Sequence, residues 1–333
     1  MSSSVWHTVT EPSNDLQPSC STPDNHAPIS PTLPPSSTCT RYRPRGSLAR
    51  ALHEKVLQDQ YLNRLDKNEW YYVDLTKLPK ELSSKFVQLN PDEETLKFLD
   101  ESEMKSDWIM TQLWHMLVKV FLGFFMTQTS INGWLERGSM FVLSHEQLLK
   151  LLRVEESIKY ESLLDLGAGD GKVTARLDPI FEKVYVTEIS GTMRKLLQKQ
   201  GYQVLEIDSW HQDRKFNVIS CLNLIDRCDK PLDLLEQIKL SLQPDGLVLM
   251  AVVLPFSAYV ESGTDHKPQQ ILPIKGATFE DQVQSLINDV LTPANFQVLS
   301  WSRVPYLCEG DLQQSYYWLD DVVLVLKVSS DPS

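Results

Sequence analysis

A regular alternation of strand and helix patterns in the second half of the chain is the feature that most constrains the fold. Between residues 161 and 328, short runs rich in β-branched residues are separated by segments with helical spacing of apolar residues. The runs are ESLLDLG, KVYVTEIS, YQVLEI, FNVISCLN, GLVLMAVVLP, FQVLSWSRV and DVVLVLKV. Strands that alternate with helices form a parallel sheet covered on both faces. The last two runs are joined by residues 305–320, which have the pattern of a long loop, so we expect an antiparallel last strand.

The first half of the chain differs in composition. Residues 1–45 are rich in Ser, Thr and Pro and lack periodic apolar residues, which predicts a disordered tail. Residues 46–155 show helical spacing, and the stretch NPDEETLKFLDESEM begins with a helix-start pattern in which Asn90 is the cap and Pro91 the first helical residue. We therefore expect a tail (1–45), a helical segment (46–155) and an α/β domain (156–329).

Charge and residue usage exclude several classes of function. The chain has 32 Lys and Arg against 44 Asp and Glu, a formal charge of −12, and no basic patch is evident, so nucleic acid is not an expected partner. The five cysteines form no C-x-x-C pair, and the seven histidines form neither a His-x-His segment nor a metal-binding spacing. The sequence therefore predicts no disulfide framework and no metal site, and it indicates no oligomeric state.

Two segments bear on the cellular location. The apolar stretch 108–126 is interrupted by polar residues such as His115 and Lys119, so we expect a buried or interfacial helix there and no membrane span. The N-terminus lacks a basic region followed by an apolar core, the pattern of a secretory signal. We expect a cytoplasmic protein, with association with endomembranes or mitochondria left open.

The stretch LLDLGAGDGKVT, residues 163–174, places three glycines directly after the first expected strand. In a doubly wound sheet, this turn lines the ligand site. The spacing of Gly167, Gly169 and Gly171 is G-x-G-x-G and differs from the dinucleotide pattern G-x-G-x-x-G. It suits S-adenosylmethionine, which carries no phosphate to be held by the helix N-terminus. Asp165, two residues earlier, either contacts this ligand or only shapes the turn.

Acidic residues at the ends of the next two strands extend this pattern. Glu188 ends the second strand at the spacing expected of a carboxylate that binds ribose hydroxyls. Asp208 ends the third strand and is a candidate for the adenine amino group, whereas Trp210 either stacks on the adenine or belongs to the core. Together these features predict an α/β, class I (Rossmann-like) S-adenosylmethionine-dependent methyltransferase with a seven-stranded, mostly parallel sheet.

The stretch ISCLNLIDRCDKP follows the fourth strand and puts Asn223 and Asp226 at the edge where the methyl group is expected. Enzymes that methylate nucleobase amino groups usually carry Asn/Asp-Pro-Pro-aromatic at this place, and that motif is absent. An amide and a carboxylate suit a substrate N–H whose partner nitrogen presents its lone pair to the methyl group. Alternatively these side chains cap the next helix, a role that Asp229, before the Lys-Pro start, fits better than Asp226.

Five stretches closely resemble one known family: TSINGWLERGSMFVLS, LLDLGAGDGKVT, ISCLNLIDRCDKPL, VLPFSAYVE and PYLCEGDLQQSYYWLDDVVLVLK. From about residue 100 to the C-terminus, the sequence is similar to the DREV (methyltransferase-like protein nine) family. The resemblance implies methylation of the pros nitrogen of histidine in His-x-His segments of proteins, with x small. It further implies that Asn223 and Asp226 contact the target imidazole, that Tyr306 and Tyr317 line the peptide site, and that Glu188 binds the cofactor ribose.

The chemistry of histidine agrees with this implied reaction. Histidine has a pKa of about 6.5, so at neutral pH the side chain carries a lone pair and needs orientation more than a strong base. We expect Asp226 to accept the tele N–H, which fixes the tautomer and stabilises the imidazolium that forms.

Two further groups of residues leave alternatives open. Tyr316 and Tyr317, beside an acidic loop with Glu309 and Asp311, suit a His-rich, cationic protein or peptide, although adjacent tyrosines before a strand also occur in sheet packing. In the stretch RGSMF, Arg137 and Ser139 either close over the methionine carboxylate of the cofactor or form a turn. A small-molecule methyltransferase and a non-catalytic cofactor-binding scaffold are the alternative functions.

Overall fold

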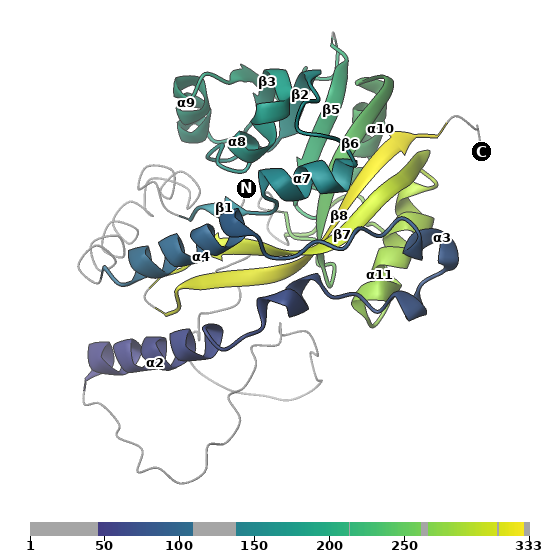
Figure 1. Ribbon diagram of the computed structural model, residues 1–333. Coiled ribbons are helices and arrows are strands. Elements are labelled where there is room, and N and C mark those ends of the chain that lie inside the picture. The colour runs from purple at the N-terminus through teal and green to yellow at the C-terminus, as the bar shows by residue number, and fades with distance from the viewer. Residues whose placement is uncertain (1–45, 109–137, 213, 261–265, 312, 330–333) are drawn as a thin grey trace, which may run out of the picture.

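The computed structural model describes residues 46–108, 138–212, 214–260, 266–311 and 313–329. The predictions for the tail 1–45, for the apolar stretch beyond residue 108 and for Arg137 lie outside these ranges. Within them the strands form one sheet in the order β1-β7-β8-β6-β5-β2-β3-β4 (Figure 1). The strands are β1 (Met140–Phe141), β2 (Tyr160–Leu166), β3 (Phe181–Thr187), β4 (Gln203–Leu205), β5 (Phe216–Leu222), β6 (Leu242–Leu254), β7 (Phe296–Glu309) and β8 (Tyr316–Val328).

The pairing of the strands confirms the predicted sheet. Strands β4, β3, β2, β5 and β6 pair in parallel, whereas β8 is antiparallel to both of its neighbours, β6 and β7. The sheet has one strand more than the seven predicted, because β1 adds two residues antiparallel to β7. A two-residue strand shows no alternation in the sequence, so the pattern could not indicate it.

The segment 305–320, predicted as a long loop, is mostly strand. Strand β7 continues to Glu309 and β8 begins at Tyr316, with Cys308 opposite Tyr317 in the register. The turn between them is closed by backbone hydrogen bonds from Gly310 N to Ser315 O and from Asp311 N to Gln314 O. The prediction was wrong because these strand ends are stabilised by residues far away in the chain, which a local pattern does not include.

The helices follow the predicted alternation. They are α2 (Ser47–Leu62), α3 (Lys80–Ser83), α4 (Glu93–Ser106), α7 (His145–Leu152), α8 (Thr174–Leu177), α9 (Gly191–Lys199), α10 (Pro231–Leu240) and α11 (Phe279–Ser285). Short 3-10 turns are η1 (Lys67–Tyr71), η2 (Leu75–Lys77) and η3 (Asp178–Ile180), and α11 continues into a π-helical turn, η4 (Leu286–Leu291). Helix α10 begins at Pro231, as its Lys-Pro start predicts.

The start of α4 differs from the prediction by two residues. Its N-cap is Asp92, whose side chain accepts a hydrogen bond from Thr95 N, so Asn90 and Pro91 precede the helix. A carboxylate that bonds the third helical N–H stabilises this start, since the first helical N–H groups have no partner within the helix.

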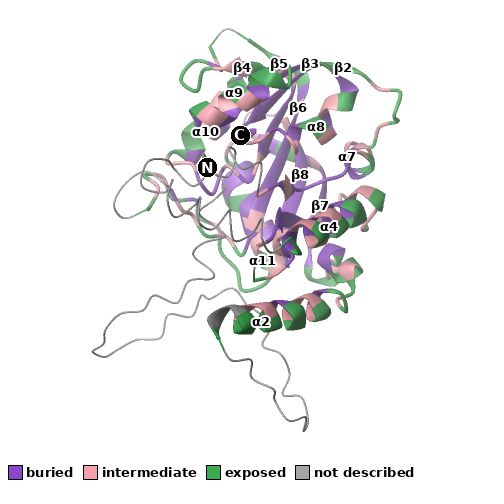
Figure 2. Cartoon of the chain, turned by 90° about the vertical axis from the view of Figure 1, so that its left-hand side faces the viewer, coloured by how far each residue is buried: buried purple, intermediate pink, exposed green. Residues whose placement is uncertain are grey.

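Helices cover both faces of the sheet. One apolar cluster joins α10 and α11 to the sheet through residues such as Ile238 and Val283. The other joins α7, α8 and α9 to the opposite face through residues such as Leu148 and Leu197. Figure 2 shows the buried strands between these layers and the exposed outer surfaces of the helices. Both faces of the sheet are therefore shielded from water, which explains the nearly continuous apolar runs of the central strands.

The segment 46–108 packs on the β7–β8 hairpin. Trp70 of η1 contacts Tyr316 and Trp318, with ring centroids 6.2 and 5.6 Å away, and Trp301 Nε1 donates to Leu82 O at 2.8 Å. Figure 1 shows α4 beside this hairpin. No helix in the described ranges is long and apolar enough to cross a membrane.

Candidate active site

The turn after β2 is built from three glycines in the left-handed region. Gly167, Gly169 and Gly171 have φ angles of 72°, 59° and 79°, a conformation that side-chain-bearing residues adopt at a cost. A Cβ atom at Gly171 would lie 2.3 Å from Gln200 Oε1 and 2.9 Å from Leu197 Cδ2, so packing also requires glycine there. A Cβ atom at Gly169 would meet nothing within 4 Å. Gly169 therefore borders open space.

Two adjoining cavities lie along this turn. The first, of about 50 Å³, is lined by Gly167, Gly169, Glu188, Asn223 and Tyr306 among others. The second, of about 540 Å³, includes Asp208 and Trp210 in its lining and shares Gly167 and Glu188 with the first. The predicted glycine turn, the acid after β3 and the acid after β4 thus line one continuous cleft at the carboxyl ends of the strands, the place where open α/β sheets bind ligands.

Glu188 joins the glycine turn to the end of β3. The side chain is buried; its Oε2 accepts a hydrogen bond from Gly169 N at 3.0 Å, and its Oε1 accepts one from Ser190 N at 2.8 Å. The carboxylate thus lies at the boundary between the two cavities, with its position fixed by backbone N–H groups.

Asp165 has the contacts of a residue that shapes the turn. Its Oδ1 accepts a hydrogen bond from the Ser220 hydroxyl at 2.6 Å and its Oδ2 one from the Thr174 hydroxyl at 2.5 Å. Burial raises the pKa of Asp165 to about 6, against the effect of the two hydroxyls. The side chain lines the first cavity, but both of its oxygens are engaged in joining β2 to β5 and α8.

Two isoleucines in the second cavity were missed by the sequence reasoning. Ile189 and Ile207 are 58% and 41% exposed, and both line this cavity beside Asp208, which is itself exposed. Trp210 is buried in the core cluster and also borders the cavity, so its place in the core is confirmed and its stacking on adenine stays a prediction. The sequence did contain an indication, because one isoleucine directly follows Glu188 and the other directly precedes Asp208. Exposed apolar side chains in a cleft are typical of ligand contact.

A buried polar cluster lies at the carboxyl ends of β5 and β6. It consists of Asn223, Asp226, Arg227 and Asp321. Asn223 Nδ2 donates to Asp321 Oδ2 at 2.7 Å, and Arg227 Nε lies 3.4 Å from Asp226 Oδ2. One side-chain atom of each residue has no hydrogen-bond partner: Asn223 Oδ1, Asp226 Oδ1, Arg227 Nη1 and Asp321 Oδ1. Because buried polar atoms are normally paired, such a cluster indicates a site for a polar ligand.

The electrostatics of the cluster follow from burial. Burial raises the pKa of Asp226, opposed by the positive charge of Arg227. Burial also raises the pKa of Asp321 well above its ordinary value, opposed by the Asn223 hydrogen bond and reinforced by the charge of Asp226.

The capping alternative for this stretch does not fit the structure. The N-cap of α10 is Lys230, and the N–H groups of Leu232 and Asp233 in the first turn donate to the side chain of Gln270 at 2.9 and 3.2 Å. Asp229 Oδ1 instead accepts a hydrogen bond from Gln269 N at 2.9 Å, and Asp226 pairs with Arg227.

The two adjacent tyrosines of β8 have different environments. Tyr316 is buried against Trp70, and its hydroxyl donates to Leu62 O. Tyr317 is half-buried and donates to Asp311 Oδ1 at 3.0 Å. Since side chains alternate along a strand, Tyr317 and Asp321 share a face of β8. Tyr306 is buried at the first cavity, whereas Tyr317 does not line either cavity.

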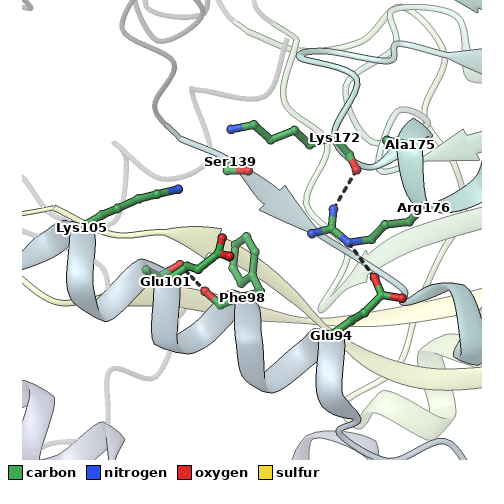
Figure 3. Close-up of a pocket in the computed structure, with 9 residues that line it drawn as sticks. Glu94, Phe98, Glu101, Lys105, Ser139, Lys172, Ala175 and Arg176 are labelled. Atoms are coloured by element: carbon green, nitrogen blue, oxygen red, sulfur yellow. Dashed lines mark hydrogen bonds and ion pairs between the residues drawn. The ribbon is translucent and has the colours of Figure 1, made fainter. Parts of the chain in front are cut away.

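Ser139 lies outside the cleft. It lines a third cavity of about 320 Å³, with Lys105 of α4 and with Lys172 and Arg176 beyond the glycine turn (Figure 3). Glu309, expected in an acidic peptide-binding loop, is buried here: it accepts hydrogen bonds from Gly138 N and Ser139 N and pairs with Lys105 at 3.0 Å. That expectation for Glu309 was wrong because β7 extends to this residue and turns its carboxylate inward. The predicted cofactor contact of Ser139 stays a prediction.

No group of three or more His, Cys, Asp or Glu side chains in the described part of the chain could hold a metal ion.

The strand order, the antiparallel β8 and the glycine turn after the central strand define a Rossmann-like methyltransferase. A family model for DREV methyltransferase matches residues 70–328, and the chain belongs to this family. It is therefore an S-adenosylmethionine-dependent methyltransferase.

Solved structures of low sequence identity are also similar. The N-methyltransferase NodS from Bradyrhizobium japonicum WM9, in complex with S-adenosyl-L-homocysteine, is 14% identical with a TM-score of 0.35, and the match covers 55% of this chain and 85% of that chain. A complex of DhpI with S-adenosylhomocysteine (SAH) is 14% identical with a TM-score of 0.37, covering 70% and 98%. An S-adenosylmethionine-dependent methyltransferase from Clostridium acetobutylicum ATCC 824 is 14% identical with a TM-score of 0.35, covering 67% and 100%.

Proposed function

We propose that the chain is a protein-histidine methyltransferase that transfers a methyl group to the pros nitrogen of histidine in His-x-His segments with a small x. The observation that carries this proposal is the pair of buried acceptors without partners, Asn223 Oδ1 and Asp226 Oδ1. Asn223 lines the first cavity together with Gly167 and Gly169, and Asp226 belongs to the same buried polar cluster as Asn223. The choice of histidine over other N–H compounds follows the resemblance of the sequence to its family.

The cleft fits S-adenosylmethionine. The open space at Gly169 leaves room beside the turn, and Glu188 presents a carboxylate for the ribose hydroxyls. The exposed side chains of Ile189 and Ile207 provide apolar contacts for adenine, with Asp208 as the acceptor for its amino group. Asp165 stabilises the glycine turn by accepting hydrogen bonds from the hydroxyl groups of Thr174 and Ser220. When bound, S-adenosylmethionine supplies an electrophilic methyl group on its sulfonium.

The polar cluster suits a neutral imidazole. Such a ring has one N–H and one lone pair, so an acceptor at the tele nitrogen leaves the pros nitrogen free to react. Asp226 Oδ1 is this acceptor in our proposal, and its negative charge stabilises the imidazolium formed by the transfer. Arg227 Nε, 3.4 Å from the other oxygen, balances part of the charge. No general base is needed, since the reacting nitrogen carries no proton.

The peptide lies along β7 and β8 in this proposal. Tyr306 borders the first cavity, and Tyr317 with its acceptor Asp311 lies farther out on the hairpin. An acidic, aromatic surface favours a cationic, His-rich segment.

Transfer of labelled methyl from S-adenosylmethionine to a His-Ala-His peptide, with the label placed by mass spectrometry, tests the proposal. The Asp226→Asn enzyme should lose at least about tenfold in kcat, because a neutral amide stabilises an imidazolium less than a carboxylate. Asp245→Asn is a matched control: Asp245 is exposed near the irregular start of β6 with φ of 63°, which asparagine tolerates. Absence of label, with SAH binding intact, would favour the small-molecule alternative.

A further inference from the structure

The Asn223 amide has its two ends in different environments. Nδ2 donates to Asp321 Oδ2 at 2.7 Å, whereas Oδ1 is buried without a partner. The backbone of Asn223 is itself held in the left-handed region, with φ of 52°, and its N–H donates to Ala251 O. The chain therefore fixes both the main chain and one end of the amide and leaves the carbonyl oxygen available.

We propose that Asp321 is a positioning residue: it holds the Asn223 amide so that the carbonyl oxygen faces the substrate. This inference rests on the proposed function, because it names a further residue that selects the substrate at that site. Asp321 Oδ2 accepts the hydrogen bond from the NH₂ end of the amide, and this contact turns the carbonyl end away from Asp321. A reversed amide would set its carbonyl oxygen against the Asp321 carboxyl group and would present its NH₂ group, in place of an acceptor, to the substrate.

The position of Asp321 in β8 supports a role in function over a role in stability. Asp321 is 0% exposed and is followed by the apolar run Val322 to Leu326. A buried carboxylate is costly, and an apolar residue of similar volume usually stabilises such a strand at least as well. Its neighbour Asp320 differs, since it pairs with Arg303 at 2.8 Å and is only partly buried.

Asp321 contacts Asn223 directly, and three charged groups surround it. Asp226 and Asp320 repel its negative charge, and Arg227 attracts it. Asn223 follows β5 and lines the first cavity, whereas Asp321 bonds it from β8, two strands away in the sheet. Asp321 thus acts on the substrate through Asn223.

The inference predicts which variants interact. Asp321→Leu should lower kcat for the His-Ala-His peptide by about 10- to 100-fold, the range for loss of a hydrogen bond to a charged group. In an Asn223→Ala enzyme the same substitution should have no further effect, because residues that act through one another are not additive. Asp321→Asn should recover part of the rate, since its carbonyl still accepts from Asn223, and Asp320→Asn is the matched control with unchanged kcat.

The orientation of the amide can be measured without any substrate. In a ¹⁵N-labelled protein, the Asn223 side-chain NH₂ signals are identified by their loss in Asn223→Asp. We expect slow hydrogen exchange of these protons in the wild type and at least tenfold faster exchange in Asp321→Leu, with SAH affinity and melting temperature maintained in the variant. If Asp321→Leu unfolds, Asp321→Ala, which also removes the acceptor, serves for the same comparison.

Each outcome decides one of the two proposals. If the exchange of the Asn223 amide is the same with and without Asp321, or if Asp321→Leu slows the Asn223→Ala enzyme as much as the wild type, the positioning role is overturned. If the amide responds to Asp321 but the wild type does not methylate the peptide, the positioning role stands and the histidine substrate is wrong.

Discussion

Replacing the glycines of the turn by alanine distinguishes two requirements for glycine: a positive φ angle, and space where a Cβ atom would lie. Gly169 and Gly171 both have positive φ, so alanine at either position costs about 1–2 kcal/mol of unfolding free energy through the backbone. At Gly169 no atom lies within 4 Å of the added methyl, and nothing is added to this cost. At Gly171 the methyl meets Leu197 and Gln200 at under 3 Å, and overpacking of this kind costs about 1–3 kcal/mol more.

SAH affinity should show the opposite order: Gly169→Ala, the more stable of the two variants, should bind SAH more weakly than Gly171→Ala. The methyl of Gly169→Ala enters the space beside the turn, so SAH affinity should fall at least about tenfold, equivalent to about 1.4 kcal/mol. Urea denaturation gives the stabilities and titration calorimetry the affinities. Gly201→Ala is the control: Gly201 has φ of 94°, open space at its Cβ and a position after α9, away from the cavities, so it should lose stability and keep affinity. A Gly169→Ala protein with wild-type SAH affinity, or one less stable than Gly171→Ala, would refute this reasoning.

Three further substitutions probe the cofactor side of the cleft. The pKa of Asp165 is about 6 in the folded protein against an ordinary 3.8, so ionisation of this carboxyl group opposes folding. As the pH rises from below 4 to above 6, the unfolding free energy of the wild type should fall by about 3 kcal/mol relative to that of Asp165→Asn. Equal pH profiles of the two proteins in urea denaturation would contradict this. Glu188→Gln should weaken SAH binding about tenfold in calorimetry, since a charged acceptor is lost. Ile207→Ser should weaken it about 3- to 10-fold with little change in melting temperature, because the side chain is 41% exposed without ligand; an equal loss of stability and affinity would indicate a structural role.

The central sheet could be predicted from sequence because its strands carry their own signal. Strands covered on both faces are apolar throughout, as in VISCL of β5 and VLMAVV of β6, and the helices between them are amphipathic. The glycine turn and Glu188 were found for the same reason, since each lies at a fixed place relative to its strand.

The hairpin ends and Asp321 could not be predicted in this way. The extension of β7 and β8 depends on Trp70, more than 200 residues earlier, which packs on Tyr316 and Trp318. Asp320 and Asp321 are adjacent in the sequence and lie on opposite faces of β8. Asp320 therefore pairs with Arg303, whereas Asp321 is buried and bonds Asn223.

The site contains residues from two sides of the sheet, and a side-chain hydrogen bond links the two sets. The residues proposed to hold the cofactor follow β2, β3 and β4, whereas Tyr306, Tyr317 and Asp321 lie on the β7–β8 hairpin. The 2.7 Å contact between Asn223, after β5, and Asp321, on β8, spans the two sets across β6. The segment 46–108 contacts the hairpin, so its apolar side chains support the substrate half of the site. In a wholly parallel sheet, the residues that bind the substrate would lie on separate loops. The antiparallel strand β8 instead carries the buried Asp321 to Asn223, which lines the first cavity.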